Sequence, residues 1–169
     1  MAKEIQLTQG KVTLVDDNMF EYLSQWKWYV YKCGNKFYAA RNIKVSKAKI
    51  RLMLMHRFIT NNKNTKMHTD HINGNGLDNR TINLRICTHS QNLINRGASI
   101  NNKTGYKGVS YDKNSNKFKA QIRVNKKNIT LLTTNNPVDA ARAYNNAAIK
   151  YFGEFAQLNV IPKENLLNL

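Results

Sequence analysis

The sequence predicts an α+β fold built mostly from short antiparallel strands. A β-rich N-terminal region with a strand–loop–strand–helix unit is followed by a three-stranded antiparallel sheet plus helix. Apolar and polar residues alternate in a hairpin pattern over residues 5–14, around the turn Gln9-Gly10. They alternate again over residues 117–124. An apolar stripe with helical spacing then covers residues 140–152.

The remainder of the N-terminal region mixes strand and helix signals. Residues 18–25 follow Asp17 and fit a short helix, and residues 26–32 are rich in aromatic and β-branched types that favour a strand. Gly34-Asn35 offers a turn into a further strand over residues 37–43. The apolar run at residues 50–59 is interrupted by charged residues and a histidine, and it fits either a strand or a helix.

The charge of the chain limits its partners. It has 27 Lys and Arg residues against 10 Asp and Glu residues, a formal net charge of +17. Such a field attracts polyanions, and nucleic acid is the commonest partner for this balance. A membrane surface is the alternative, but the sequence offers no basic amphipathic helix. The acids are few: between residues 22 and 138 they are Asp70, Asp78 and Asp112. Metal binding is one reason to keep a carboxylate in so basic a region.

Other classes are disfavoured. No run approaches the roughly 20 apolar residues of a membrane span, and the N-terminus has no apolar signal-peptide core. Cys33 and Cys87 form no CxxC pair and no disulfide framework. We therefore expect a reducing, cytoplasmic setting.

Residues 67–97 form the most informative unit. Strands are expected at residues 67–72 and 83–87, joined by a loop that begins with the turn-rich run Asn73–Gly76. Thr88 followed three residues later by Gln91 is a capping box, which predicts that a helix begins there. This arrangement can bring three polar side chains together: Asp70, His71 and Asn92.

Several blocks of this region resemble the ββα-metal motif of HNH homing endonucleases of phage and intron type. The resemblance covers residues 1–97, including the opening run Ile5–Lys11, and His56 matches the upstream histidine of that group. The matching blocks are Asp70-His71-Ile72-Asn73-Gly74-Asn75, Asn83-Leu84-Arg85 and Gln91-Asn92.

The resemblance implies a role for each residue. His71 would be the general base, and Asp70 and Asn92 would hold one Mg²⁺ or Mn²⁺ ion per active site. The ion would bridge to the scissile phosphate and stabilise the leaving 3′ oxygen. Asn83 would tie the loop and orient His71. His56 would support the site, and Arg85 would contact DNA.

A structural zinc site is the rival interpretation. Four residues could in principle supply its ligands: His68, His71, Cys87 and His89. That arrangement would leave Asp70 and the capping box unexplained, and the Cys-x-His spacing is unusual. Stoichiometric, tightly bound zinc would favour it.

The C-terminal region predicts three strands and a helix. Strands are expected at residues 107–111, 117–124 and 128–133. The helix has Asn136 as N-cap, Pro137 at its first position and Gly153 after its end. Its apolar stripe contains Ala140, Ala141, Tyr144, Ala147, Ala148, Tyr151 and Phe152.

Residues 103–160 resemble the AP2 DNA-binding domain, in which a three-stranded sheet enters the major groove. The blocks that match are Gly105–Val109, Lys117–Arg123, Asp139–Asn145 and Ala147–Gly153, with Asn159 at the closing position. Ser110, Asn128 and the run Leu131–Thr134 depart from the family pattern, so base specificity cannot be transferred. The resemblance and the polar strand face together imply DNA contacts from Lys107, Lys117, Lys119, Gln121 and Arg123.

The sequence therefore predicts an HNH endonuclease domain at residues 1–97 with its core at 67–97, a linker at 98–104, an AP2-like domain at 105–160 and a tail at 161–169. The expected function is a metal-dependent DNA endonuclease of homing type, anchored by its C-terminal domain on double-stranded DNA. We expect a monomer with no membrane association and no small-molecule cofactor, in the bacterial host cell if phage-encoded. The alternative is a catalytically inactive DNA-binding regulator. An RNA-directed nuclease is weaker, because no aromatic stacking sheet is evident.

Overall fold

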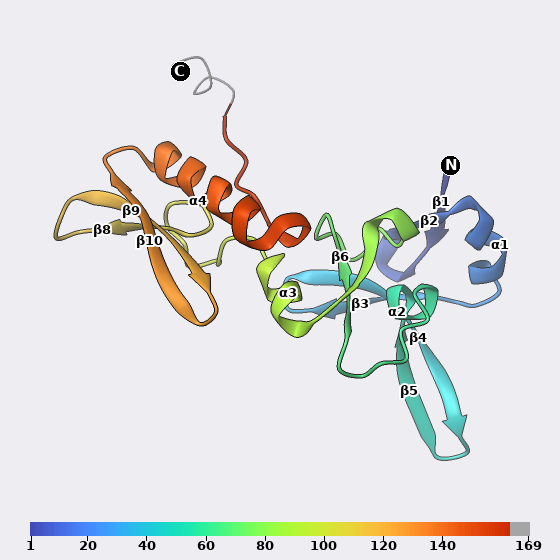
Figure 1. Cartoon of the computed structure of the whole chain (residues 1–169). Coiled ribbons are helices and arrows are strands. Elements are labelled where there is room, and N and C mark those ends of the chain that lie inside the picture. Colours follow the sequence, from blue (N-terminus) through green and yellow to red (C-terminus); the bar gives the residue numbers. More distant parts are fainter. Residues whose placement is uncertain (163–169) are drawn as a thin grey trace. The chain divides into compact units, whose positions relative to one another are not determined.

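The computed structural model describes residues 1–162, and its fold is α+β with mostly antiparallel sheets (Figure 1). The chain divides between Asn92 and Leu93 into two compact units. Most of the predicted tail, residues 163–169, lies outside the described residues. Over residues 1–162, no helix combines the length and the apolar character needed to cross a bilayer.

The first unit opens with the predicted hairpin. Strands β1 (Ala2–Gln6) and β2 (Val12–Asp16) pair antiparallel and lead into helix α1 (Asp17–Ser24). Val15 from β2 and Leu23 from α1 are fully buried in the core of the unit. The alternation predicts the core side of β1, where Ile5 is buried, but it is wrong for β2: Thr13 and Val15 are buried there, and the apolar residues Val12 and Leu14 are only half-buried.

A second sheet follows, with the order β3 (Tyr29–Cys33), β4 (Lys36–Ser46) and β5 (Lys49–Leu54). The apolar run at residues 50–59 forms both a strand and a helix, because β5 ends at Leu54 and helix α2 (Met55–Ile59) begins at the next residue. Met55 is fully buried, whereas Ile50 on the strand is 70% exposed.

The third piece of the first unit has the predicted order of elements. Strand β6 (His68–His71) pairs antiparallel with β7 (Leu84–Cys87), and helix α3 (His89–Ile94) follows. The predicted capping box is present: the Thr88 amide donates to Gln91 Oε1 at 2.8 Å, and the Gln91 amide donates to Thr88 Oγ1 at 3.2 Å.

The second unit contains a three-stranded antiparallel sheet in the order β10 (Lys127–Thr134), β9 (Lys117–Val124) and β8 (Val109–Asp112). Helix α4 (Pro137–Phe152) packs on this sheet. Asn136 caps it as predicted, accepting a hydrogen bond from the Val138 amide at 2.9 Å.

Three expectations for the second unit need correction. Strand β8 begins at Val109 and not at residue 107, because Gly108 has a positive φ of 73°. Tyr151 does not belong to the buried stripe of α4, since it is 44% exposed. The expected linker is tied to the sheet in part, because Asn102 Nδ2 donates to the carbonyl oxygens of Tyr106 and Val109 at 2.7 and 3.2 Å.

Candidate active site

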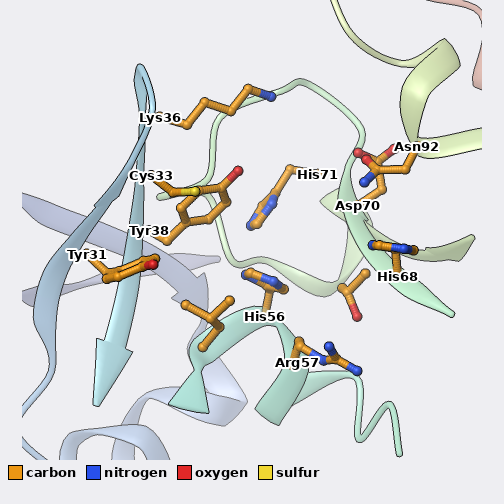
Figure 2. A pocket seen from close by; sticks show the side chains of 12 residues that line it. Tyr31, Cys33, Lys36, Tyr38, His56, Arg57, His68, Asp70, His71 and Asn92 are labelled. Carbon is orange, nitrogen blue, oxygen red and sulfur yellow. The ribbon is translucent and has the colours of Figure 1, made fainter. Parts of the chain in front are cut away.

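One pocket of the first unit gathers most of the predicted site residues. His56 from α2, Asp70 and His71 from β6 and Asn92 from α3 all line it (Figure 2). The cavity measures about 240 Å³, several times the roughly 30 Å³ that one water molecule occupies in the liquid. The strand–loop–strand–helix order therefore does bring these distant polar residues to one place.

His71 is buried and held by a side chain that we did not predict. Its Nε2 lies 3.3 Å from Asn79 Oδ1. Burial lowers the pKa of the His71 imidazole below its ordinary value of 6.5, against the raising effects of the Asn79 hydrogen bond and the Asp70 charge. The imidazole is therefore neutral at neutral pH, as a proton acceptor must be.

Asp70 is buried beside His71 and forms an ion pair with Arg85. The Arg85 Nε and Nη2 atoms both donate to Asp70 Oδ2, at 3.1 and 3.0 Å. The Arg85 side chain is 11% exposed and lies against this carboxylate, while the DNA contact expected of it stays a prediction. Arg85 supplies the opposite charge that a buried carboxylate needs.

The other two acids of the basic region also have partners, but they lie outside the pocket lining. Asp78 accepts from Arg80 Nε and Nη2 at 2.7 and 2.6 Å, and from Asn73 Nδ2 at 2.9 Å. Asp112 accepts from the Asn114 amide at 3.0 Å in a surface turn. Asp70 is thus the one of the three that lines the pocket.

Asn83 lies outside the pocket lining and ties the loop, which is the first part of its predicted role. Its Nδ2 donates to the Asp78 carbonyl at 2.8 Å, and its Oδ1 accepts from the Asn73 amide at 3.0 Å. The side chain that meets His71 Nε2 is that of Asn79, four residues earlier in the chain. Asn83 therefore fixes the shape of the loop that carries Asn79.

His56 lies against His71 in the pocket. The two ring centroids are 4.8 Å apart in an edge-to-face arrangement, and the Tyr38 ring flanks both (Figure 2). Burial, with smaller electrostatic contributions from the neighbouring His71 and Arg57, lowers the pKa of His56 to about 3. Its Nδ1 is buried without a hydrogen-bond partner. His56 is therefore an uncharged side chain that lines the pocket at neutral pH.

Two cations that sequence reasoning missed also line the pocket, Lys36 from β4 and Arg57 from α2. Arg57 was adjacent to the recognised His56, but nothing in the sequence linked the β4 residues Lys36 and Tyr38 to this site. Their placement depends on how the second sheet packs, which local patterns do not report.

The zinc alternative is not assembled. Within residues 1–162, no group of three or more His, Cys, Asp or Glu side chains is arranged to hold a metal ion. The rings of His68 and His89 are 5.2 Å apart, while Cys87 is fully buried and its thiol pKa is raised by burial. The pocket instead offers a carboxylate from Asp70 and an amide from Asn92, hard oxygen donors of the kind that suit Mg²⁺ with water completing its shell.

In the second unit, β9 presents the predicted polar face. Ala120 and Ile122 are buried in the cores beneath α4, so the residues that alternate with them lie on the opposite face. Lys107 is placed differently, because its ammonium donates to the carbonyl oxygens of Ile94 and Arg96, and burial lowers its pKa to about 8. The residues on the polar face are Lys117, Lys119, Gln121 and Arg123.

Comparison with known proteins points to one family. No family model matches the chain. A protein of Acanthamoeba polyphaga mimivirus named "Uncharacterized HNH endonuclease L560" is 32% identical over 155 residues, which cover 90% of this chain and 77% of the relative. At this identity and coverage, the chain belongs to the HNH endonuclease family.

Proposed function

We propose that this protein is a DNA endonuclease that hydrolyses phosphodiester bonds with His71 as general base and one divalent ion, Mg²⁺ or Mn²⁺. The observation that carries the proposal is that His71, Asp70 and Asn92 line one pocket although Asn92 lies about twenty residues along the chain. Membership of the HNH family supports a nuclease, and the net charge of +17 supports a polyanionic substrate.

His71 would take a proton from water as the water oxygen attacks phosphorus. The new phosphorus–oxygen bond forms while the bond to the 3′ oxygen breaks, so the protein must stabilise charge on both sides of the phosphate. Lys36 and Arg57 line the same pocket and supply positive charge there. The neutral, buried state of His71 supports this role, because a protonated imidazole could accept nothing.

Asp70 and Asn92 would hold the metal ion. When bound, the ion would neutralise phosphate charge and stabilise the leaving oxygen. Arg85 bonds to Oδ2 of Asp70 and so fixes the orientation of the carboxylate before the ion arrives. Two protein ligands leave the remaining positions to water and phosphate, as is usual for Mg²⁺.

The direct test is plasmid cleavage with Mg²⁺ by the wild type and by His71→Ala. We expect the variant to lose about 10²–10⁴-fold in rate, the usual contribution of a general base. His89→Ala is the matched control, because His89 is exposed on α3 and does not line the pocket. Equal cutting by wild type and His71→Ala would remove His71 from the mechanism.

The C-terminal sheet would anchor the enzyme on duplex DNA in the manner of an AP2 domain. Lys117 and Arg123 are exposed on the face of β9 opposite α4, where cations can reach phosphates and guanine edges. A second cationic surface belongs to the first unit, on the exposed hairpin of β4 and β5. Its cations are Lys44, Lys47, Lys49 and Arg51.

The anchor can be tested through the salt dependence of binding. Changing Lys117 and Arg123 together to Gln should lower the slope of log affinity against log salt by about 2, near 0.9 for each lost phosphate contact. Cutting at saturating protein should persist. A catalytically inactive regulator would instead bind DNA but fail to cut it, whichever divalent metal is added. Competition between duplex DNA and RNA for binding tests the RNA-directed alternative.

A further inference from the structure

A buried chain of three hydrogen bonds runs from the N-terminal hairpin to His71. The Thr13 hydroxyl of β2 donates to the Leu77 carbonyl at 2.7 Å, and Asn79 Nδ2 donates to Thr13 Oγ1 at 2.7 Å. Asn79 Oδ1 then lies 3.3 Å from His71 Nε2. Thr13 and Asn79 are 0 and 1% exposed, so solvent does not compete for these bonds.

The chemistry of each group fixes the direction of the chain. A carbonyl oxygen only accepts, so the Thr13 hydroxyl donates its one hydrogen to the Leu77 carbonyl and can only accept from other groups. Asn79 must therefore present its NH₂ group to Thr13, which turns its carbonyl oxygen toward His71. Because that oxygen also only accepts, His71 Nε2 must carry the hydrogen.

The backbone holds these groups in place. The Leu14 amide of β2 donates to the Leu77 carbonyl at 2.9 Å, and the Asn79 amide donates to the Leu14 carbonyl at 2.8 Å. Strand β2 is thus hydrogen-bonded to the loop on both sides of Asp78. The Leu77 carbonyl receives two donors, Thr13 Oγ1 and the Leu14 amide, which matches its two lone pairs.

We propose that Thr13 is a positioning residue: by fixing which end of the Asn79 amide faces His71, it holds His71 as its Nε2–H tautomer, so that Nδ1 is the nitrogen that takes the proton from water. The inference rests on the proposed nuclease function and adds the machinery that prepares its base. In a neutral imidazole with hydrogen on Nε2, the basic lone pair lies on Nδ1. The tautomer is therefore set by a strand almost sixty residues away in the sequence.

The test combines cleavage kinetics with nitrogen NMR of His71 at a pH where the ring is neutral. Thr13→Val keeps the branched shape and removes the hydroxyl, and Thr13→Ser keeps the hydroxyl. We expect Thr13→Val and Asn79→Leu to lower kcat by about 10–100-fold, as loss of a group that orients a reactive residue does, with KM little changed. Thr13→Ser should stay near the wild-type rate.

The NMR signature separates positioning from mere folding. In the wild type, Nε2 should give a protonated-type shift and Nδ1 an unprotonated-type shift, and Thr13→Val should mix the two tautomers. An Nδ1–H tautomer in the wild type would overturn the proposal even if the protein cuts DNA. So would wild-type kcat in both Thr13→Val and Asn79→Leu. If His71→Ala cuts normally, the nuclease mechanism fails instead, and the NMR result still decides the tautomer.

Discussion

The two units of the chain hold their polar groups in opposite ways. In the first unit, His56, Asp70 and His71 are buried, and Asp70 and His71 are bonded to specific partners. In the second unit, Lys117 and Arg123 stand exposed on a small sheet. Burial fixes the orientation and the protonation state of a side chain, and chemistry at one phosphorus atom requires both. Exposed cations instead suit binding that is spread along a polyanion. A single substitution at the buried site of the first unit should therefore have a large effect on cleavage, whereas each substitution on the exposed sheet of the second unit should have a small effect on binding.

A pair of glycine substitutions gives the largest expected contrast. A Cβ on Gly76 would lie 2.4 Å from the Phe37 carbonyl oxygen and 2.6 Å from the Tyr38 ring. A Cβ on Gly108 would lie 2.0 Å from the Tyr144 ring. Gly76→Ala should displace the loop that carries Asn79 and lower single-turnover cleavage by about 10²-fold or more. Gly108→Ala should disturb the packing of α4 on its sheet, weaken DNA binding and spare cutting at saturating protein.

Gly97→Ala is the matched control, because nothing lies within 4 Å of its added Cβ. The measurement is cleavage at saturating and at limiting protein. Loss of cutting by Gly108→Ala at saturation would break the proposed division of labour between the units.

The next largest effect is expected from Arg85→Met. Removing Arg85 leaves Asp70 as a buried carboxylate without this ion pair, which costs about 3–5 kcal/mol of unfolding free energy. If Asp70 binds the ion, Mg²⁺ should return part of this loss, because a ligand that binds the folded state stabilises it. Denaturant unfolding with Mg²⁺ and with EDTA measures both effects. The same Mg²⁺ response in Arg85→Met and in the double variant with Asp70→Asn would exclude Asp70 as a ligand.

A smaller effect concerns pH. The folded-state pKa of His56 is about 3, below its ordinary 6.5, so the unfolded state binds the proton more readily. The resulting stability is present above pH 6.5 and is lost as pH falls toward 3. At pH 5 the loss attributable to His56 should be about 2 kcal/mol relative to pH 8. Comparing wild type with His56→Phe isolates it, because the other titrating groups are shared. Parallel pH curves for the two proteins would contradict the assignment.

The sequence was informative where the determining interactions are local. The capping box at Thr88 and Gln91 and the cap at Asn136 involve residues two or three positions apart, and both are present in the structure. The α+β class and the hairpin followed from periodicity alone. Periodicity did not assign the apolar run at residues 50–59, because its strand and its helix form one continuous apolar segment and only tertiary packing distinguishes them.

The candidate site was predictable in part for the same reason. Asp70 and His71 on β6 and Asn92 on α3 belong to one short motif, and they line one pocket. Thr13 bonds to Asn79 across 66 positions in the chain, and no local pattern reports such a pair. Arg85 was expected to contact DNA, but its partner across the strand pair is Asp70, and its side chain forms an ion pair with that buried acid.

The smallest expected effect tests whether the two units are independent. Asn136→Ala removes the hydrogen bond to the Val138 amide and should lower the stability of the second unit by about 1 kcal/mol. Asn135→Ala is the neighbouring control. Trp26 and Trp28 both lie in the first unit, so tryptophan fluorescence follows that unit while circular dichroism follows both. We expect the fluorescence transition and the cutting rate to stay unchanged. A fluorescence shift as large as the dichroism shift would mean that the units unfold together, and the contrast drawn between them would then describe their surfaces but not their folding.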